Sequence, residues 1–113
     1  MAYIKNFTGE ILYKVEKDTI TDFYGKILLR YNEQTVQNFN MQILYRINGE
    51  SVSDFTFKIL YKIGNGLVRD FYGKILYKYD SNALYAFTGQ ILYKFDGVIP
   101  HAALCAFIAG LCE

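Results

Sequence analysis

Hydrophobic and polar residues alternate with a short period along most of the chain. In the segment Ile-Leu-Tyr-Lys-Val at residues 11–15, the odd-numbered positions are apolar or aromatic and Lys14 between them is charged. This two-residue alternation is typical of a β-strand. β-branched and aromatic residues dominate such segments, and turn-forming pairs such as Asn48-Gly49 separate them. The pattern therefore predicts short strands joined by turns.

The same 16-residue unit occurs six times without insertion or deletion and covers residues 4–99. Each copy has a phenylalanine, then an Ile-Leu pair, a tyrosine that only Leu29 replaces, a basic residue and a bulky apolar residue. The phenylalanines are Phe7, Phe23, Phe39, Phe55, Phe71 and Phe87. A fixed short period indicates one supersecondary unit whose neighbouring copies bury each other's apolar faces.

Two turn signals in each copy predict two short strands per copy and about twelve strands in all. One signal reads Asx-Phe-x-Gly, as in residues 6–9, and is typical of a type I turn followed by a glycine bulge. Met41 and Phe57 occupy the glycine position in two copies, where a positive φ would cost roughly 1 kcal/mol or more. Either these two turns change type, or the segment from Phe to Tyr is one bent strand.

Two architectures fit this pattern, namely hairpins arranged radially about one axis and a stacked β-solenoid. The basic residue of each copy favours the radial arrangement, because a solenoid would stack all six in one ladder at about 4.8 Å spacing. These residues are Lys14, Arg30, Arg46, Lys62, Lys78 and Lys94. Adjacent Ile and Leu side chains point to opposite faces of a strand, so we expect both faces to be covered. The expected fold is therefore all-β, with six hairpin repeats placed radially.

The Asx-x-x-Gly hairpin and the short apolar strand after it resemble the small bacterial domains called β-flowers, known best in a four-fold form. The resemblance covers most of residues 4–99. It implies a radial or barrel-like arrangement of hairpins. Because that family is largely uncharacterised, the resemblance implies no active site.

The tail at residues 100–113 departs from the repeat but belongs to the same single domain, residues 1–113. Pro100 can open a helix, and the Ala-rich segment after it is apolar on nearly all sides, so we expect a buried α-helix. Burial of its four largest side chains is expected to contribute on the order of 6 to 12 kcal/mol. The helix could plug the ring of hairpins, close one end, or pair with the tail of another molecule to form a homo-oligomer.

Length and composition indicate one compact domain: 113 residues, 52% hydrophobic, with a formal net charge of +1. So small a net charge favours neither nucleic acid nor an anionic membrane as a partner. The first five residues lack the apolar segment of a signal peptide, and no apolar run reaches the roughly 20 residues of a membrane span. We therefore expect a cytoplasmic protein.

No residues have the spacing of a catalytic or metal site, so we expect a protein that is not an enzyme and needs no cofactor. His101 and Cys105 lie four residues apart on the expected helix, but a surface histidine and a small core cysteine explain them better. Cys105 and Cys112 are two turns apart, too far to form a disulfide. Aspartates at the Asx position alternate with asparagine in other copies, which indicates turn formers. These aspartates are Asp22, Asp54 and Asp70.

The repeated basic residues point to a non-enzymatic binding or interaction module whose positive rim contacts an acidic partner or small anion. A simpler interpretation is a solvated rim whose lysines keep edge strands from pairing. Eleven tyrosines without tryptophan also allow a lectin-like domain with one shallow sugar site per copy. The five repeated tyrosines share the phase of core residues, so Tyr24 and Tyr72 at the turn tips are the better candidates for exposed contacts. These five are Tyr13, Tyr45, Tyr61, Tyr77 and Tyr93.

Overall fold

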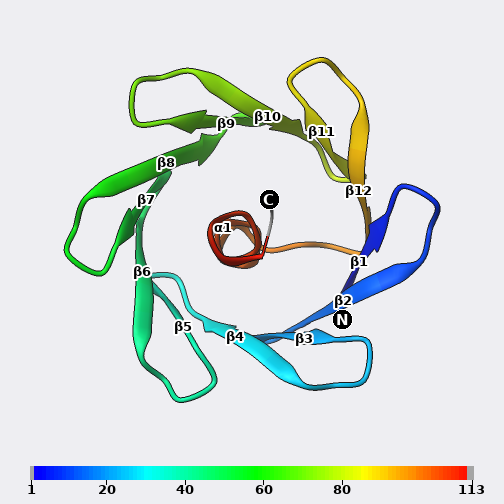
Figure 1. Ribbon diagram of the computed structural model, residues 1–113, viewed down its shortest axis with the longest axis horizontal. Helices are drawn as coiled ribbons and strands as arrows, with labels where there is room; N and C mark the ends of the chain where they lie inside the picture. Colours follow the sequence, from blue (N-terminus) through cyan, green and yellow to red (C-terminus); the bar gives the residue numbers. More distant parts are fainter. Residues whose placement is uncertain (1, 112–113) are drawn as a thin grey trace.

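The computed structural model describes residues 2–111, in which twelve antiparallel strands close into a barrel around one helix (Figure 1). The molecule is a disc with extents of 36 × 35 × 20 Å. Every strand pairs with its neighbours in chain order, and β1 pairs with β12 to close the ring. The predicted radial all-β repeat with a C-terminal helix is thus confirmed, and the solenoid alternative is wrong.

Each copy of the repeat contributes two strands, and the tail forms the helix. The elements are β1 (Ala2–Asn6), β2 (Ile11–Glu16), β3 (Thr19–Asp22), β4 (Ile27–Tyr31), β5 (Thr35–Gln37), β6 (Ile43–Asn48), β7 (Ser51–Asp54), β8 (Ile59–Gly64), β9 (Leu67–Asp70), β10 (Ile75–Tyr79), β11 (Ala83–Ala86), β12 (Ile91–Asp96) and α1 (His101–Gly110).

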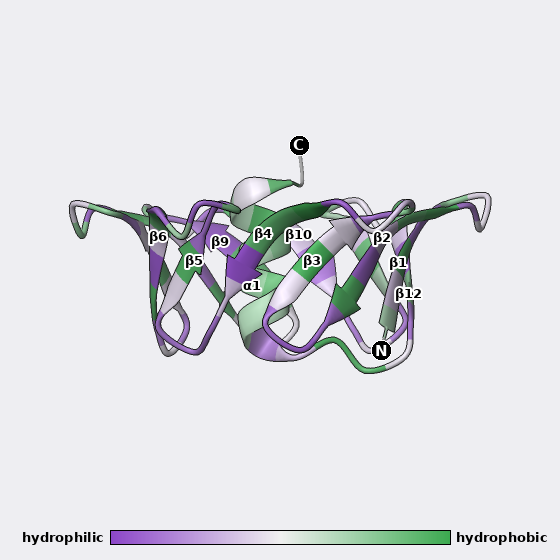
Figure 2. Cartoon of the chain, turned by 90° about the horizontal axis from the view of Figure 1, so that it is seen from below, coloured by the Kyte–Doolittle hydropathy of each residue, from purple (hydrophilic) through white to green (hydrophobic). Residues whose placement is uncertain are grey.

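The hairpins whose turns contain the repeated phenylalanine point away from the barrel axis, and we call them petals (Figure 1). The six petals are β1–β2, β3–β4, β5–β6, β7–β8, β9–β10 and β11–β12. The petal tips flare outward at one end of the disc, the petal end, whereas the turns between petals gather at the opposite, narrow end (Figure 2). The disc therefore has two ends of different shape.

A β-bulge bends every described petal at the leucine of the Ile-Leu pair. In the first petal Ile4 lies opposite Tyr13 and Lys5 lies opposite Ile11, so Leu12 is an extra residue in β2. The same shift recurs in the other five petals. Because a bulge bends the strand and increases its twist, the outer part of each petal turns away from the barrel wall. The expected regular alternation through Ile and Leu is wrong at this point.

The hydrophobic core lies between the barrel wall and α1. Each odd-numbered strand contributes one fully buried aliphatic residue: Ile4, Ile20, Val36, Val52, Val68 and Leu84. Their cross-strand partners on the even-numbered strands are also apolar, as in the pair Val15 and Ile20. The repeated tyrosines are half-buried and pack against this core, which confirms their predicted packing role.

Helix α1 lies inside its own ring of strands, so the tail plugs the barrel. Phe107 is fully buried and makes edge contacts with Tyr13 and Tyr93, at ring-centre distances of 5.7 and 5.0 Å. The end of the predicted tail, including Cys112, lies outside the described residues. Within residues 2–111, no helix has the length and apolar character needed to cross a membrane.

The helix also explains the one break in the tyrosine series. It contacts β3, β4 and β6, and a Cβ added to Gly110 would lie only 2.8 Å from Cδ1 of Leu29. Leu29 stands where the other copies have tyrosine and is almost fully buried. A tyrosine ring would collide with α1 here, so leucine is the residue that fits.

Candidate functional site

Each petal tip is a tight turn, and in five of the six petals an Asx side chain holds it in place, whereas the sixth petal has Ala86 at this position. In the second petal, Oδ1 of Asp22 accepts hydrogen bonds from the backbone N–H groups of Tyr24 (2.8 Å) and Lys26 (2.9 Å). The Gly25 N–H donates to the Asp22 carbonyl at 3.1 Å. Equivalent side-chain bonds form at Asn6, Asn38, Asp54 and Asp70. The prediction that these aspartates are turn formers is confirmed.

The petal turns keep this form even where glycine is absent. The fourth turn residue has a φ of 90° at Gly25, 68° at Met41 and 75° at Phe57. Both non-glycine turns retain the backbone bond from this residue to the Asx carbonyl. The expectation that these turns change type, or that the segment is one bent strand, is therefore wrong. The Asx bonds and the closed barrel hold a conformation that costs roughly 1 kcal/mol at each residue.

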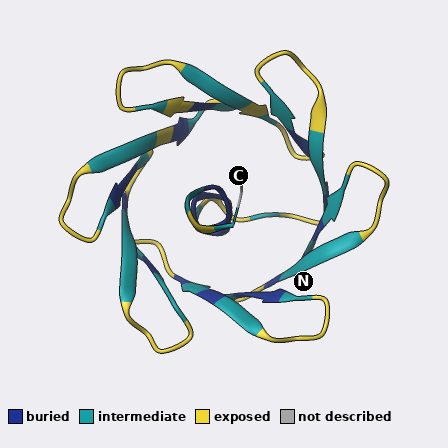
Figure 3. Ribbon diagram, viewed as in Figure 1, coloured by how far each residue is buried: buried dark blue, intermediate teal, exposed yellow. Residues whose placement is uncertain are grey.

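The petal tips are exposed (Figure 3), and their aromatic side chains lie largely in solvent. The phenylalanine of each copy is more than half exposed, from 51% at Phe23 to 65% at Phe7. Tyr24 and Tyr72 are about 90% exposed, as their predicted place at the tips requires. Sequence reasoning missed the phenylalanines, because a large apolar residue at a fixed period suggests a buried position. Only their place inside the turn signal could have revealed the exposure.

The repeated basic residues lie on even-numbered strands beside the tip of the following petal. The Lys14 Nζ lies 5.5 Å from the ring centre of Phe23, and the Arg46 Cζ lies 4.4 Å from that of Phe57. The Arg46 Nε also donates to the Phe55 carbonyl at 3.1 Å. At exposed sites such cation–π contacts contribute about 0.5 to 1 kcal/mol. Basic and aromatic side chains thus alternate around the petal end.

The cations have no edge strand to protect, because the described strands form a closed ring. Protection of edge strands is therefore no reason for these cations, although a solvated rim stays the simpler interpretation. Among residues 2–111 only Lys5 forms an ion pair, with Asp96 at 3.1 Å. None of the six rim residues takes part in an ion pair within this part of the chain.

The fold separates charges that cancel in the sequence. The turns at the narrow end, together with the strand ends Glu16 and Asp96, carry six acidic residues and one basic residue, Lys17, for a net charge of −5. The acidic residues are Glu16, Asp18, Glu33, Glu50, Asp80 and Asp96. The barrel wall and petals carry the other eleven basic residues and four acidic ones, for a net charge of +7. When the charges of the two chain termini are left out, the two ends of the short axis therefore carry opposite net charges.

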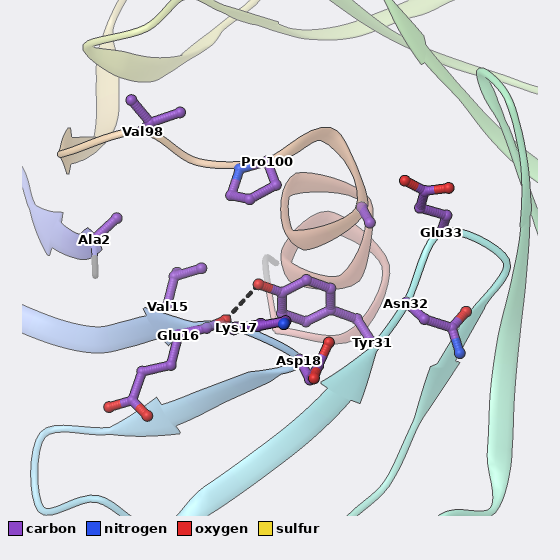
Figure 4. A pocket seen from close by; sticks show the side chains of 11 residues that line it. Ala2, Val15, Glu16, Lys17, Asp18, Tyr31, Asn32, Glu33, Val98 and Pro100 are labelled. Atoms are coloured by element: carbon purple, nitrogen blue, oxygen red, sulfur yellow. Dashed lines mark hydrogen bonds between the residues drawn. The ribbon is translucent and has the colours of Figure 1, made fainter.

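A cavity of about 420 Å³ opens at the narrow end, next to the start of α1 (Figure 4). Its lining combines apolar side chains, including Val15 and Pro100, with Asp18 and Glu33. The Tyr31 hydroxyl lies across it and donates to the Glu16 carbonyl. Burial raises the pKa of Tyr31, and the Asp18 carboxylate adds to the effect. The lining contains no histidine or cysteine that could form a nucleophile–base pair.

His101 and Cys105 contact each other at the start of α1. The His101 Nε2 lies 2.8 Å from the Gly49 carbonyl and 3.5 Å from the Cys105 Sγ. Burial raises the pKa of Cys105 to about 12, so the thiol stays protonated at neutral pH. The prediction of a surface histidine and a core cysteine is confirmed. Within residues 2–111, no three His, Cys, Asp or Glu side chains are grouped to hold a metal ion.

The fold and the site together define a class of protein: a closed radial barrel of hairpins with a helix in its centre, exposed aromatic tips and oppositely charged ends. No protein-family model, curated protein or solved structure matches the chain. The resemblance to β-flowers therefore stays a prediction from the residues of the repeat.

Proposed function

We propose that the protein is a non-enzymatic binding module that contacts an acidic partner through the basic rim of its petal end. The observation that carries this proposal is the separation of charge, with a net +7 on the wall and petals and −5 at the narrow end. Such a distribution steers an anionic partner toward one end of the molecule and repels it from the other.

The exposed aromatic tips supply the second component of the binding surface. Each rim cation lies on the strand next to a tip phenylalanine, as Lys14 does beside Phe23. A partner that pairs with the cations would therefore cover apolar rings in the same contact. Protein binding surfaces combine these two contributions: burial of aromatic side chains supplies much of the affinity, and charge orients the partner.

A direct test measures binding to poly-L-glutamate by isothermal calorimetry at 50 and 300 mM salt. We expect binding at low salt, weaker binding at high salt, and loss of binding when all six rim residues are changed to Gln. These residues are Lys14, Arg30, Arg46, Lys62, Lys78 and Lys94. A matched control changes Glu16, Glu33 and Glu50 to Gln at the narrow end and should bind at least as well. Unchanged binding by the six-Gln variant would refute the rim proposal.

A lectin-like domain is the second candidate, favoured by open hollows beside two tips. One hollow of about 510 Å³ adjoins Tyr24, and another of about 290 Å³ adjoins Tyr72. Only these two tips carry tyrosine at this position, so sugar binding would use two sites and not one per copy. A glycan array with wild type and a Tyr24→Ala, Tyr72→Ala double variant tests this candidate, and the absence of any signal would eliminate it.

A further inference from the structure

We propose that the acidic partner is the surface of an anionic lipid bilayer, on which the petal end lies flat with its six tips in the headgroup region. This inference rests on the proposed function and specifies its partner. It follows from the shape of the petal end, the side chains at the tips and the direction of the charge separation.

The shape of the petal end matches a flat and extended target. The disc is 36 × 35 Å across and 20 Å thick, and its petals spread outward at about one level, with the last turn of α1 reaching slightly beyond them (Figure 2). The six tips therefore lie around the edge of one broad face, and a deformable surface can contact all of them. A globular partner with a single protruding site would meet only one or two petals.

The apolar residues at the tips suit the boundary between water and lipid. Among residues 2–111, every exposed large apolar side chain except Ile91 and Val98 lies at a petal tip. Ile91 directly follows the last tip. Aromatic side chains are enriched where an apolar phase meets a polar one. A ring of such side chains around one broad face could insert into the headgroup region of a bilayer without reaching its hydrocarbon core.

The charge separation orients the disc on an anionic bilayer. Lysine and arginine residues near the headgroups are attracted by anionic lipids, and the attraction falls off within a Debye length. The rim cations lie next to the tips, as Lys14 and Arg46 show, and so would lie at headgroup depth. The acidic narrow end faces away on the far side of the disc. The expectation of no membrane partner used the net charge of +1, which the fold divides between two ends.

A second copy of the chain covers this surface less well. Face-to-face pairing would bring together the basic rims of two copies, each with a net charge of +7 on its wall and petals. Head-to-tail stacking satisfies the charges, but the narrow end lies inside the circle of the flared tips, so the tip phenylalanines would stay in solvent (Figures 1 and 2). A lipid surface is the occupant that meets both the charges and the rings.

The test is cosedimentation of the full chain with phosphatidylcholine vesicles that contain 0% or 30% phosphatidylserine, at 100 mM salt. We expect at least tenfold tighter binding to the anionic vesicles. The tip variant changes four exposed phenylalanines to Ser and leaves Phe23 and Phe57, which contact Lys14 and Arg46, in place. The four are Phe7, Phe39, Phe71 and Phe87, and this variant should bind at least tenfold more weakly. Val98→Ser is the matched control, because Val98 is 88% exposed but lies near the narrow end, and it should bind like wild type.

A tryptophan probe reports the depth of each end, since the chain has no tryptophan of its own. The emission of Phe39→Trp should shift to shorter wavelength on anionic vesicles, and that of Val98→Trp should not. Equal binding by the tip variant, or a shift of the Val98→Trp probe alone, overturns the proposed orientation.

The outcomes separate this inference from the proposed function. Binding to poly-L-glutamate without binding to vesicles overturns the lipid inference and leaves the binding module in place. Binding to neither overturns both. Self-association in analytical ultracentrifugation that the tip variant abolishes, without vesicle binding, assigns the surface to a second copy and also overturns the lipid inference.

Discussion

Replacing Leu29 with tyrosine restores the repeat, yet we expect it to destabilise the protein. Five of the six copies have tyrosine at this position, so a consensus argument would expect the change to stabilise by about 0.5 to 2 kcal/mol. Packing predicts the opposite sign. The change therefore tests whether α1 lies where the structure places it.

The magnitude follows from the space around Leu29. This side chain is 4% exposed, and even a methyl group on Gly110 would come within 2.8 Å of its Cδ1. A tyrosine must displace α1 or leave its rotamer, and overpacking of this kind costs typically about 1 to 3 kcal/mol. For a chain of this size that loss lowers Tm by roughly 4 to 12 °C.

The assay is urea unfolding followed by far-UV circular dichroism, with the free energy of unfolding compared between Leu29→Tyr and wild type. Leu29→Met is the matched control, because it conserves volume and should cost less than about 1.5 kcal/mol. A stability equal to or above wild type for Leu29→Tyr would show that the helix does not press on β4 and that the break in the repeat has another origin.

Four further outcomes are expected. Phe107→Ala should lower the free energy of unfolding by about 3 to 5 kcal/mol, because Phe107 is fully buried against two tyrosines, and a loss below about 1 kcal/mol in urea unfolding would argue against a packed helix. Deletion of residues 100–113 should abolish cooperative unfolding or cause aggregation in gel filtration, whereas a truncated chain with an unchanged Tm would contradict the role of the tail as a plug. Both Met41 and Gly25 have positive φ, so Met41→Gly should stabilise the protein by about 0.5 to 1 kcal/mol and Gly25→Ala should destabilise it by about 1 kcal/mol, as measured by thermal unfolding. Effects of the opposite sign would contradict this account of the turn. The free energy of unfolding should fall from about pH 9 toward pH 12, because burial raises the pKa of Cys105 to about 12 and the unfolded chain loses this proton first. Cys105→Ala should show a shallower fall, and Tyr31 and Tyr79, whose pKa values burial also raises, should account for the remainder. An identical slope in the variant would contradict the assignment to Cys105.

The fold could be predicted because most of its determinants are local. Alternation around Lys14 gives the strands, and the Asx acceptor gives the tips, as the bonds from Asp22 to its own turn show. The six-fold repetition then makes each local prediction apply to the whole ring. The bulge at Leu12 was not predicted, because in the sequence an inserted residue looks like one more strand position.

The candidate site was predicted only in part, because its properties depend on closure. Lys14 and Tyr24 could be singled out from repetition and turn position alone. The exposure of Phe23 depends on the flare of the petals, and the opposite charge of the two ends depends on which turns come together when β1 meets β12. These are relations between copies that are far apart in the chain, and no pattern within one copy contains them.

The helix in the centre also limits how the repeat can evolve. An open array gains or loses a unit at its end with little effect on the others. Here a seventh petal would raise the strand number from twelve to fourteen and widen the ring by about one-sixth, since barrel diameter grows roughly with strand number. The single helix, already in contact with one side through Gly110, could no longer fill the interior. Copy number and tail are therefore inherited together, and a change in one requires a matching change in the size of the other.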